Sequence, residues 1–392
     1  MSEPRNIVFI LGNGFDLDNG FKTSYQNFWE SDYCPKFYPA PLIFHLNEKW
    51  GNDLSRVKWY DLENELLEYG LHGKKEDIIS DNEKQYIRDH QDWSISNIIR
   101  YVGGDHVCES LLEKGIIRIR EDQFHLQHID VPYREDIQLN SISRDQRAFQ
   151  LIKESLCNYL RSIENNIDPY RYNSPFQVFR TLVDGVDSNH TLNIYTFNYT
   201  SVPWGFSSEY QDIIHYVHGN YHDNNIIIGT RDVSIEKEYD FLQKAFDKGF
   251  YPPPIVEDLD SADEVIIYGH SLGLNDRQYF KPFFTRQSGF DQSRKKDITI
   301  ITKDDESEVE IKRSLQQLTD NQLSVLMSKN NVRFIKTDNL IDDPTELSNF
   351  LIEHGTSKTD AMEIIGKIVE YKKSLLAQQS NTPVPPSARC SS

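Results

Sequence analysis

The 392-residue sequence has few cysteines and no recognisable metal-binding pattern. No two cysteines have the spacing of a zinc finger or of a disulfide framework, which favours a reducing compartment. His125 and His128 are three residues apart, but no acidic or cysteine partner stands at ligand spacing. We therefore expect no metal site. The four cysteines are scattered along the chain at Cys34, Cys108, Cys157 and Cys390.

Long apolar runs and excess positive charge are also missing. No stretch approaches the roughly 20 apolar residues that span a bilayer, and Ile7–Leu11 is too short for a signal region. We expect a cytoplasmic protein that does not associate with membranes. The 42 basic and 61 acidic residues give a net charge of −19, which disfavours general nucleic-acid binding. This charge does not exclude a small anionic ligand held by backbone N–H groups.

The sequence does contain a glycine turn directly after its first apolar run. Ile7–Leu11 has the length and character of a buried parallel strand, and Gly12 and Gly14 flank Asn13 immediately after it. Glycines allow a sharp turn and a close approach to a ligand. Since ligands of open α/β sheets bind at the carboxyl ends of strands, we expect a nucleotide here. The third glycine of the dinucleotide fingerprint is replaced by Leu17.

The second half of the chain alternates between β-rich runs and charged, helix-prone segments such as Glu306–Leu318. This alternation is typical of an α/β protein with a parallel sheet. The first strand has no partner before residue 190, so we predict a Rossmann-like, mostly parallel sheet with a large helical insertion after the first strand. The β-rich runs are Leu192–Thr196, Ile213–Val217, Ile226–Ile228, Val265–Tyr268, Ile298–Ile301 and Val332–Ile335.

This pattern predicts four segments. Residues 1–30 and 190–340 form the Rossmann-like core, and residues 31–189 form a mainly helical insertion. Helical apolar spacing within the insertion occurs in Asp61–Leu67 and Phe149–Leu160. Residues 341–378 are expected to be helical, with a helix over about 344–378, and the Pro/Ser-rich residues 379–392 are expected to be disordered.

Polar side chains follow four of the predicted strands. In a parallel sheet these strand ends lie along one edge, and convergent Asn, Asp, His and Ser side chains are what a ligand site requires. Taken singly, Asn198 and Asp16 are equally consistent with helix or turn caps, and His218 with a buried, hydrogen-bonded histidine. The four segments are Gly12–Asp16, Thr196–Thr200, His218–Asn220 and Gly269–Gly273, the last followed by Asn275 and Asp276.

The fourth segment also fits a different chemistry. Gly269–Gly273 has the Gly-x-Ser-x-Gly pattern of the α/β-hydrolase nucleophile elbow, with Ser271 as the nucleophile. Asp338 or Asp342 would then supply the acid and His354 the base. His354, however, stands in a sequence that resembles a helix end, and Asp276 points to a polar pocket instead.

Together these motifs resemble the bacteriophage abortive-infection AbiH family, over roughly residues 5–340. The resemblance implies a role in bacterial defence against phage, with infected cells dying or arresting. The motifs that carry it are Leu11–Leu17, Gly20–Tyr25, Phe28, Trp59–Glu63, Phe197–Thr200, His218–Gly219, Gly269–Gly273, Asp276 and Tyr279–Phe280.

The order of the motifs is also similar to that of sirtuin-like domains, some of which hydrolyse NAD in defence. The sirtuin-like asparagine matches Asn198 and the catalytic histidine matches His218. This resemblance implies NAD as the substrate, with no metal required. The chain departs from the pattern at Asn13, where a small alanine is usual, and at Asp16, where serine is usual; a carboxylate there repels a pyrophosphate unless it faces the ribose. The zinc-binding cysteine quartet of deacetylases is missing.

The resemblance further implies roles for other residues around the NAD. Asn198 would orient water or a ribose hydroxyl, and His218 would act as general base. Asp16 or Glu63 would bind ribose hydroxyls, and Ser271 and Asp276 the adenosine end. The Gly12–Gly14 backbone would approach the pyrophosphate. The remaining expected contacts to the nucleotide are Asn13, Phe15, Thr23 and Gly269.

Two further hypotheses belong to other classes of protein. The same pocket could sense NAD or a related nucleotide without turnover and signal through the insertion. Alternatively, the acidic insertion is itself the interaction surface. Because a toxic hydrolase needs restraint, we expect control by a homo-oligomer or a regulatory protein partner.

Overall fold

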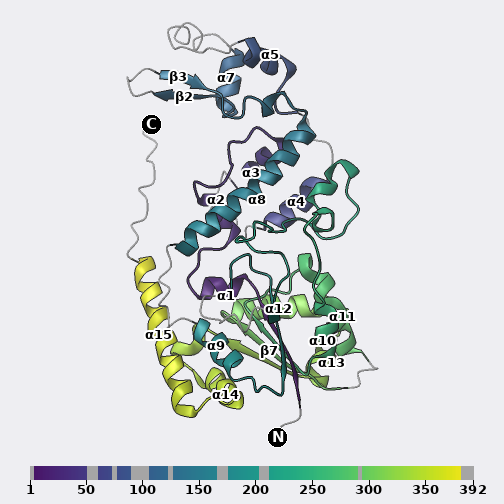
Figure 1. The fold of residues 1–392 in the computed structure, drawn as a ribbon, viewed down its shortest axis with the longest axis vertical. Coiled ribbons are helices and arrows are strands. Elements are labelled where there is room, and N and C mark those ends of the chain that lie inside the picture. Colours follow the sequence, from purple (N-terminus) through teal and green to yellow (C-terminus); the bar gives the residue numbers. More distant parts are fainter. Residues whose placement is uncertain are drawn as a thin grey trace. The chain divides into compact units, whose positions relative to one another are not determined.

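The computed structural model describes residues 4–50, 61–72, 77–89, 106–121, 127–165, 175–202, 212–289 and 294–380. The chain divides into two compact units (Figure 1). The first, which we call the sheet unit, comprises residues 1–23, 162–222 and 251–392. The second, the helical unit, comprises residues 24–161 and 223–250.

The sheet unit contains a sheet of six parallel strands, in the order β5–β4–β1–β6–β7–β8. The first strand lies in the middle, paired with β4 on one side and β6 on the other, so it is buried on both faces. The prediction of an α/β fold with a Rossmann-like parallel sheet is confirmed. The strands are β1 (Asn6–Leu11), β4 (Thr191–Thr196), β5 (Ile214–Tyr216), β6 (Glu264–Tyr268), β7 (Asp297–Thr302) and β8 (Asn331–Lys336).

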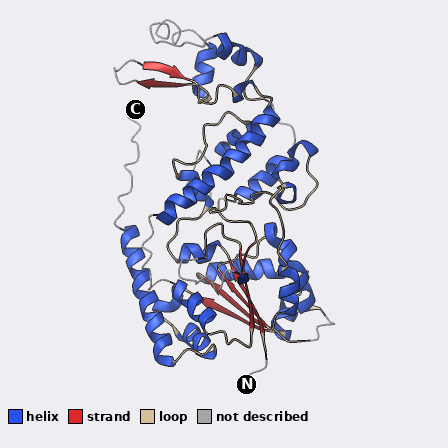
Figure 2. Ribbon diagram, in the orientation of Figure 1, coloured by secondary structure: helices blue, strands red, loops and turns tan. Residues whose placement is uncertain are grey.

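Helices cover both faces of this sheet (Figure 2). The alternation of side chains along β1 sends Ile7, Phe9 and Leu11 into one apolar core, and Val8 and Ile10 into the other. The first core is completed by α9 (Phe176–Asp184), α14 (Thr345–Glu353) and α15 (Lys358–Ser380). The second is completed by α10 (Ile255–Ser261), α11 (Arg277–Ser288), α12 (Asp305–Leu318) and α13 (Leu323–Lys329). Three short elements, α1 (Asn13–Asp18), η5 (Leu274–Asp276) and η6 (Asp338–Ile341), follow strands of this unit.

The helical unit is built around the long helix α8 (Ser141–Asn165), whose last turn is counted with the sheet unit. A buried carboxylate, Asp145, fixes its start by accepting hydrogen bonds from the Leu42 amide and the Tyr69 hydroxyl. The other elements are α2 (Tyr25–Glu30), α3 (Pro41–Trp50), α4 (Leu62–Leu71), α5 (Asp81–Asp89), α7 (His106–Glu113), β2 (Arg118–Glu121), β3 (Gln127–Asp130), η1 (Asp136–Gln138), η3 (Lys237–Leu242) and η4 (Lys244–Phe246).

The division into units differs from the boundaries expected from the sequence. Helix α9 and the C-terminal helices belong to the sheet unit, because their apolar faces complete its core. Residues 223–250 belong instead to the helical unit. The helix expected over about 344–378 is two helices, separated near Gly355, whose φ of 89° is unfavourable for other residues.

One predicted strand was wrong, and one pair of strands was not predicted. Ile226–Ile228 is not a strand: the run is buried, but the chain there forms only an isolated bridge from Thr230 to Gln243. An apolar run reports burial and not conformation. The antiparallel pair β2–β3 was not predicted in the insertion, because its sequence is largely polar.

Some predictions fall outside the described residues, namely Trp59 and Tyr60 of the family motif, His125, Cys390 and residues 381–392 of the tail. None of the helices in the described ranges combines the length and apolar character of a bilayer-spanning helix.

Candidate active site

The order of the strands defines where a ligand would bind. From β1 the chain adds β4 and then β5 on one side, and it returns to add β6, β7 and β8 on the other. The direction therefore reverses between β1 and β6. In open α/β sheets, the crevice at the carboxyl ends of the strands at this reversal is the usual ligand site. The four predicted polar segments all follow strands at this end of the sheet, as the sequence predicts.

The glycines after β1 pack against the loop that follows β6. The amide of Gly14 donates to the carbonyl of Gly269 at 2.8 Å. A Cβ atom on Gly12 would lie 2.5 Å from the Cα of His270, and one on Gly269 would lie 2.0 Å from the amide nitrogen of Phe15. Glycine is therefore required at these positions to bring the two loops together, whether or not a nucleotide approaches them.

Asp16 is a buried carboxyl in the short helix α1, with 3% of its surface exposed. Its Oδ2 accepts a hydrogen bond of 2.6 Å from the hydroxyl of Thr200, which follows β4. Burial raises the pKa of Asp16 to about 7; the hydrogen bonds from Thr200 and Asn198 oppose this, and the charge of Glu164 adds to it. In the described part of the chain Asp16 has no cationic partner, so this carboxyl changes charge near neutral pH.

Asn198 connects the ends of β4 and β1. Its side-chain Nδ2 donates to the carbonyl of Gly12 at 3.1 Å, and its backbone N–H donates to the hydroxyl of Thr196. The side-chain oxygen, in contrast, is buried and has no hydrogen-bond partner among the described residues. A buried acceptor without a donor is costly, and such atoms are found at sites that bind ligand or water.

His218 and His270 share one carboxylate. His218 Nε2 lies 2.9 Å from Asp276 Oδ1, and His270 Nε2 lies 3.5 Å from Asp276 Oδ2. Both imidazoles are 95% or more buried, whereas the Asp276 side chain is 18% exposed. The loop after β5 contributes His218, and the loop after β6 contributes His270 and Asp276. Together the two loops form a histidine–carboxylate–histidine group.

Aromatic rings surround the two imidazoles. The ring of Phe197 lies edge-on to both, with its centroid 5.4 Å from that of His218 and 4.4 Å from that of His270. Tyr279 and Phe280 of α11 pack against Phe197 in turn. This apolar wall fixes the rings and lowers the local dielectric, which strengthens the attraction between an imidazolium and Asp276.

The remaining predicted site residues have other neighbours. The hydroxyl of Thr23 donates to Asn13 Oδ1 at 2.6 Å, which ties the loop after α1 to the first turn. Phe15 is a core residue that packs edge-on against Phe179 and Tyr268. Ser271 is exposed on the loop after β6.

Glu63 lies in the helical unit, in the first turn of α4, where its Oε1 is 3.0 Å from the ammonium nitrogen of Lys244. Both side chains of this ion pair are nearly buried. The pair therefore gives Glu63 a structural role, while its expected contact to ribose remains a prediction.

The alternative of a serine hydrolase does not agree with the structure. His354 would be the base, but it bonds to Glu264, the first residue of β6, at the opposite end of the strands from Ser271. The nucleophile of such an elbow is itself strained, but the left-handed residues of this loop are Gly269 and Leu272, not Ser271. The short η5 also separates Ser271 from the helix α11. Among the described residues, Ser271 has no hydrogen bond to a histidine.

The predicted set missed Thr200 and His270 as site residues. Both stand within the motifs that carry the family resemblance, next to residues that were selected. Thr200 is two residues from Asn198, and His270 precedes Ser271. Their position directly after strands was the available signal. The contact of Thr200 with Asp16 joins segments that are distant in the sequence, whereas His270 and Asp276 belong to the same loop after β6.

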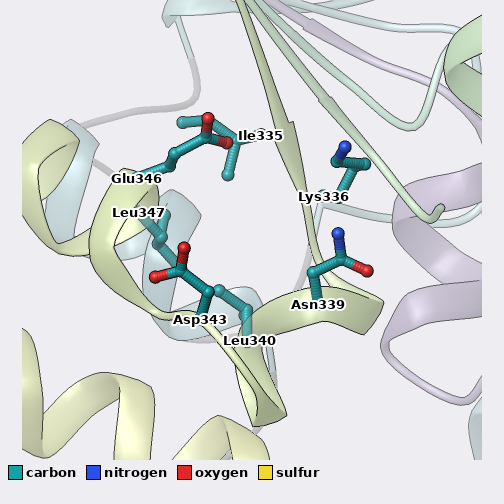
Figure 3. Close-up of a pocket in the computed structure, with 7 residues that line it drawn as sticks. All are labelled: Ile335, Lys336, Asn339, Leu340, Asp343, Glu346 and Leu347. Carbon is teal, nitrogen blue, oxygen red and sulfur yellow. The ribbon is translucent and has the colours of Figure 1, made fainter. Parts of the chain in front are cut away.

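A small pocket opens at the carboxyl end of the edge strand β8 (Figure 3). None of the predicted site residues lines it, and its one lysine, Lys336, is already paired with Asp305 and Glu308. Among the described residues, no group of three or more histidine, cysteine or acidic side chains is placed to hold a metal ion. The pocket is lined by Ile335, Lys336, Asn339, Leu340, Asp343, Glu346 and Leu347.

The arrangement of motifs and fold corresponds to one known protein family. The model of the family described as bacteriophage abortive infection AbiH matches residues 8–294. The match includes the four strand-end segments of the site and the whole range of the helical unit. Comparison with curated proteins gives no match, and comparison with solved structures gives none either.

The chain therefore belongs to the bacteriophage abortive infection AbiH family. Membership implies a role in defence against phage, as the resemblance of the motifs predicted.

Proposed function

We propose that this abortive-infection protein hydrolyses the bond between nicotinamide and ribose in NAD. The observation that supports this most directly is the bond between His218, which follows the edge strand β5, and Asp276, which follows β6, at the carboxyl ends of the strands together with Asn198. A buried imidazole that bonds to a carboxylate is suited to act as a general base. The position at the strand reversal is where α/β proteins bind nucleotides.

The reaction places few demands on the protein. The nicotinamide of NAD is cationic, so it departs as a neutral base when the C1′–N bond breaks and takes the electron pair of that bond. The ribose passes through a state that resembles an oxocarbenium ion, as in other glycoside cleavage. Water then forms the new C1′–O bond and loses a proton, and the products are nicotinamide, ADP-ribose and H⁺.

His218 would receive that proton. Because its Nε2 faces the Asp276 carboxylate, Nε2 carries the hydrogen and Nδ1 is the nitrogen that can accept a proton. Asp276 holds the ring in this tautomer and stabilises the imidazolium that forms. This is a different role from the contact to the adenosine end that the resemblance implies for Asp276.

Asn198 and Asp16 would position the sugar. The buried oxygen of Asn198 can accept a hydrogen bond from a ribose hydroxyl or from the attacking water. Asp16 lies on the neighbouring helix α1, hydrogen-bonded to Thr200. Because its carboxyl is mostly uncharged below a pH of about 7, it repels the pyrophosphate less than an ordinary aspartate would.

The test is to incubate the purified protein with NAD and to follow nicotinamide and ADP-ribose by chromatography, beside His218→Ala. We expect the wild type to release both products in equal amounts and His218→Ala to release neither. Equal release by the two proteins, or an inactive wild type in every oligomeric state obtained, would contradict the proposal.

A second candidate function is nucleotide sensing without turnover. The near-complete burial of Asn198, His218 and His270 favours it, since such residues can close around a ligand without exchanging water. NAD binding without product would identify a sensor. In either case we expect self-association or a protein partner to restrain the effector.

A further inference from the structure

His270 has no part in the mechanism above, yet its environment is as specific as that of His218. Its side chain is 5% exposed, and its Nδ1 accepts a hydrogen bond of 2.9 Å from the amide of Leu272. A ring nitrogen that accepts from a backbone N–H carries no hydrogen. The hydrogen of the neutral ring therefore lies on Nε2, and that nitrogen faces Asp276 Oδ2 at 3.5 Å.

An unusual backbone conformation produces this hydrogen bond. Leu272 has a φ of 54°, in the left-handed region that leucine seldom adopts, and its side chain is almost fully buried. Gly269, at the start of the same loop, also has a positive φ of 67° and packs against the backbone of Gly14 and Phe15. Strained positions of this kind persist only where the surroundings enforce them, and they cluster at functional sites.

The two imidazoles on Asp276 are consequently not equivalent. His270 cannot gain a proton on Nδ1 without losing the hydrogen bond from Leu272, because two donors would then face each other. His218 has no such constraint from Leu272. The fixed N–H of His270 thus faces Oδ2 of Asp276, while His218 bonds to Oδ1.

We propose that His270 is a positioning residue that orients Asp276 toward His218, and that the backbone of Leu272 fixes it in the Nε2–H tautomer for this purpose. The proposal rests on the hydrolysis proposed above for its kinetic consequences. The 3.5 Å separation is at the outer limit of a hydrogen bond, and such contacts in ligand-free sites commonly shorten in the complex with substrate.

A matched pair of variants separates this role from a merely structural one. In His270→Gln, the amide nitrogen reaches the place of Nε2 and can donate to Asp276. In His270→Asn, the shorter side chain keeps an acceptor for the Leu272 amide but does not reach Asp276. We expect His270→Gln to stay within about threefold of the wild-type kcat for NAD. We expect His270→Asn to lose about tenfold or more in kcat with little change in KM, and to have an altered acid limb in its pH profile.

A wild-type kcat and pH profile in His270→Asn would overturn the proposal. An equal loss of kcat in folded His270→Gln and His270→Asn would also overturn it, because a general packing role does not distinguish a glutamine from an asparagine at this position. Far-UV circular dichroism and urea unfolding of each variant establish that the proteins compared are folded.

A spectroscopic measurement tests the same point without turnover. With ¹⁵N-labelled histidine, long-range ¹H–¹⁵N spectra show which ring nitrogen carries the hydrogen. We expect His270 as the Nε2–H tautomer, and we expect the ring signals of His218 to shift in His270→Asn but not in His270→Gln. The other tautomer, or unchanged His218 signals in His270→Asn, would overturn the proposal. If these signals behave as expected while NAD is not cleaved, the proposed function fails and the positioning role stands.

Discussion

His218 and His354 are both largely buried histidines whose Nε2 lies 2.9 Å from a carboxylate, but they stand at opposite ends of the sheet. His354 also directs Nδ1 to the carbonyl of Phe350 at 2.7 Å. Both of its nitrogens therefore face acceptors, which favours the protonated form of the ring. Burial lowers the pKa of His354, but the hydrogen bond and charge of Glu264 outweigh it, and the net pKa is raised.

Acidic side chains at the two ends of the sheet differ in whether a cation lies beside them. At the amino ends, Arg5 lies 3.4 Å from Glu264 and 2.7 Å from Asp297, so these acids have cations beside them. At the carboxyl ends, Asp16 has a hydroxyl partner and, within the described residues, no cation. The same side-chain types thus give fixed ion pairs around β6 and β7 at the amino ends. At the carboxyl ends, ion pairs such as Asp18–Lys372 stand beside groups that can exchange protons, namely Asp16 and the His218–Asp276 pair. The comparison assigns stability to the first set and chemistry to the second.

The largest effect is expected from Asp276→Asn at the carboxyl ends. The amide keeps the size of the side chain but removes the charge that holds His218 in its tautomer and stabilises its protonated form. We expect kcat for nicotinamide release to fall by roughly 10² to 10⁴, by analogy with other histidine–aspartate pairs. Steady-state kinetics with NAD measure this. A loss under fivefold in a folded protein would remove Asp276 from the mechanism.

Asp16→Asn should change stability with pH, in a direction set by the raised pKa. The folded protein binds the proton of Asp16 up to a pH of about 7, whereas the unfolded chain releases it near 4. Stability that depends on this proton is full below about 4 and is lost as the pH rises to about 7. The variant cannot ionise, so we expect it to be more stable than the wild type at pH 8.5 by roughly 2–3 kcal/mol, with the gap closing toward pH 4.

Urea unfolding at several pH values measures this gap. Asp18→Asn provides the control on the same helix, because Asp18 is paired with Lys372 and its replacement is expected to destabilise the protein. A wild type that is more stable than Asp16→Asn at pH 8.5 would show that the carboxyl is ionised and stabilised in the fold.

At the amino ends, His354→Ala should lower stability and leave turnover unchanged. The raised pKa means that the contribution of His354 is full below its unfolded pKa of about 6.5 and is lost as the pH rises through the higher folded value. We expect a loss of about 1–2 kcal/mol at pH 5.5 and a smaller one at pH 9. Thermal unfolding at these two pH values tests the direction. A loss that grows with pH contradicts it.

The smallest effect is expected from Ser271→Ala, at the same end of the sheet as His218. If Ser271 only contacts the nucleotide, KM for NAD rises about two- to fivefold while kcat is unchanged. A serine nucleophile would instead lose nearly all activity and would react with a fluorophosphonate probe in the wild type. Labelling of Ser271 would therefore restore the hydrolase hypothesis.

Much of the sheet unit could be predicted from local sequence patterns. The apolar runs of β1, β4, β6 and β7 are short and are bounded by turn residues, and the long gap after β1 identified the insertion. The four strand-end segments followed because parallel strands place their carboxyl ends together. The prediction of a strand at Ile226–Ile228 failed, because a buried loop and a buried strand have the same apolar sequence pattern.

The partners within the site could not be predicted, because they join loops far apart in the chain. The contact between His218 and Asp276 spans 58 residues, and that between Asp16 and Thr200 spans 184. His270 stands in the same loop as Asp276, but nothing in the sequence indicates that His218 contacts the same carboxylate. The positive φ of Leu272, which fixes His270, is likewise invisible in a residue type that rarely adopts it.

The most direct test is to measure NAD turnover and urea unfolding together for His218→Ala and His354→Ala. We expect His218→Ala to lose nicotinamide release in a protein that still unfolds cooperatively, whereas His354→Ala keeps turnover and loses stability at pH 5.5. If His354→Ala abolishes turnover in a folded protein, or His218→Ala retains it, the assignment of chemistry to the carboxyl ends of the sheet is contradicted.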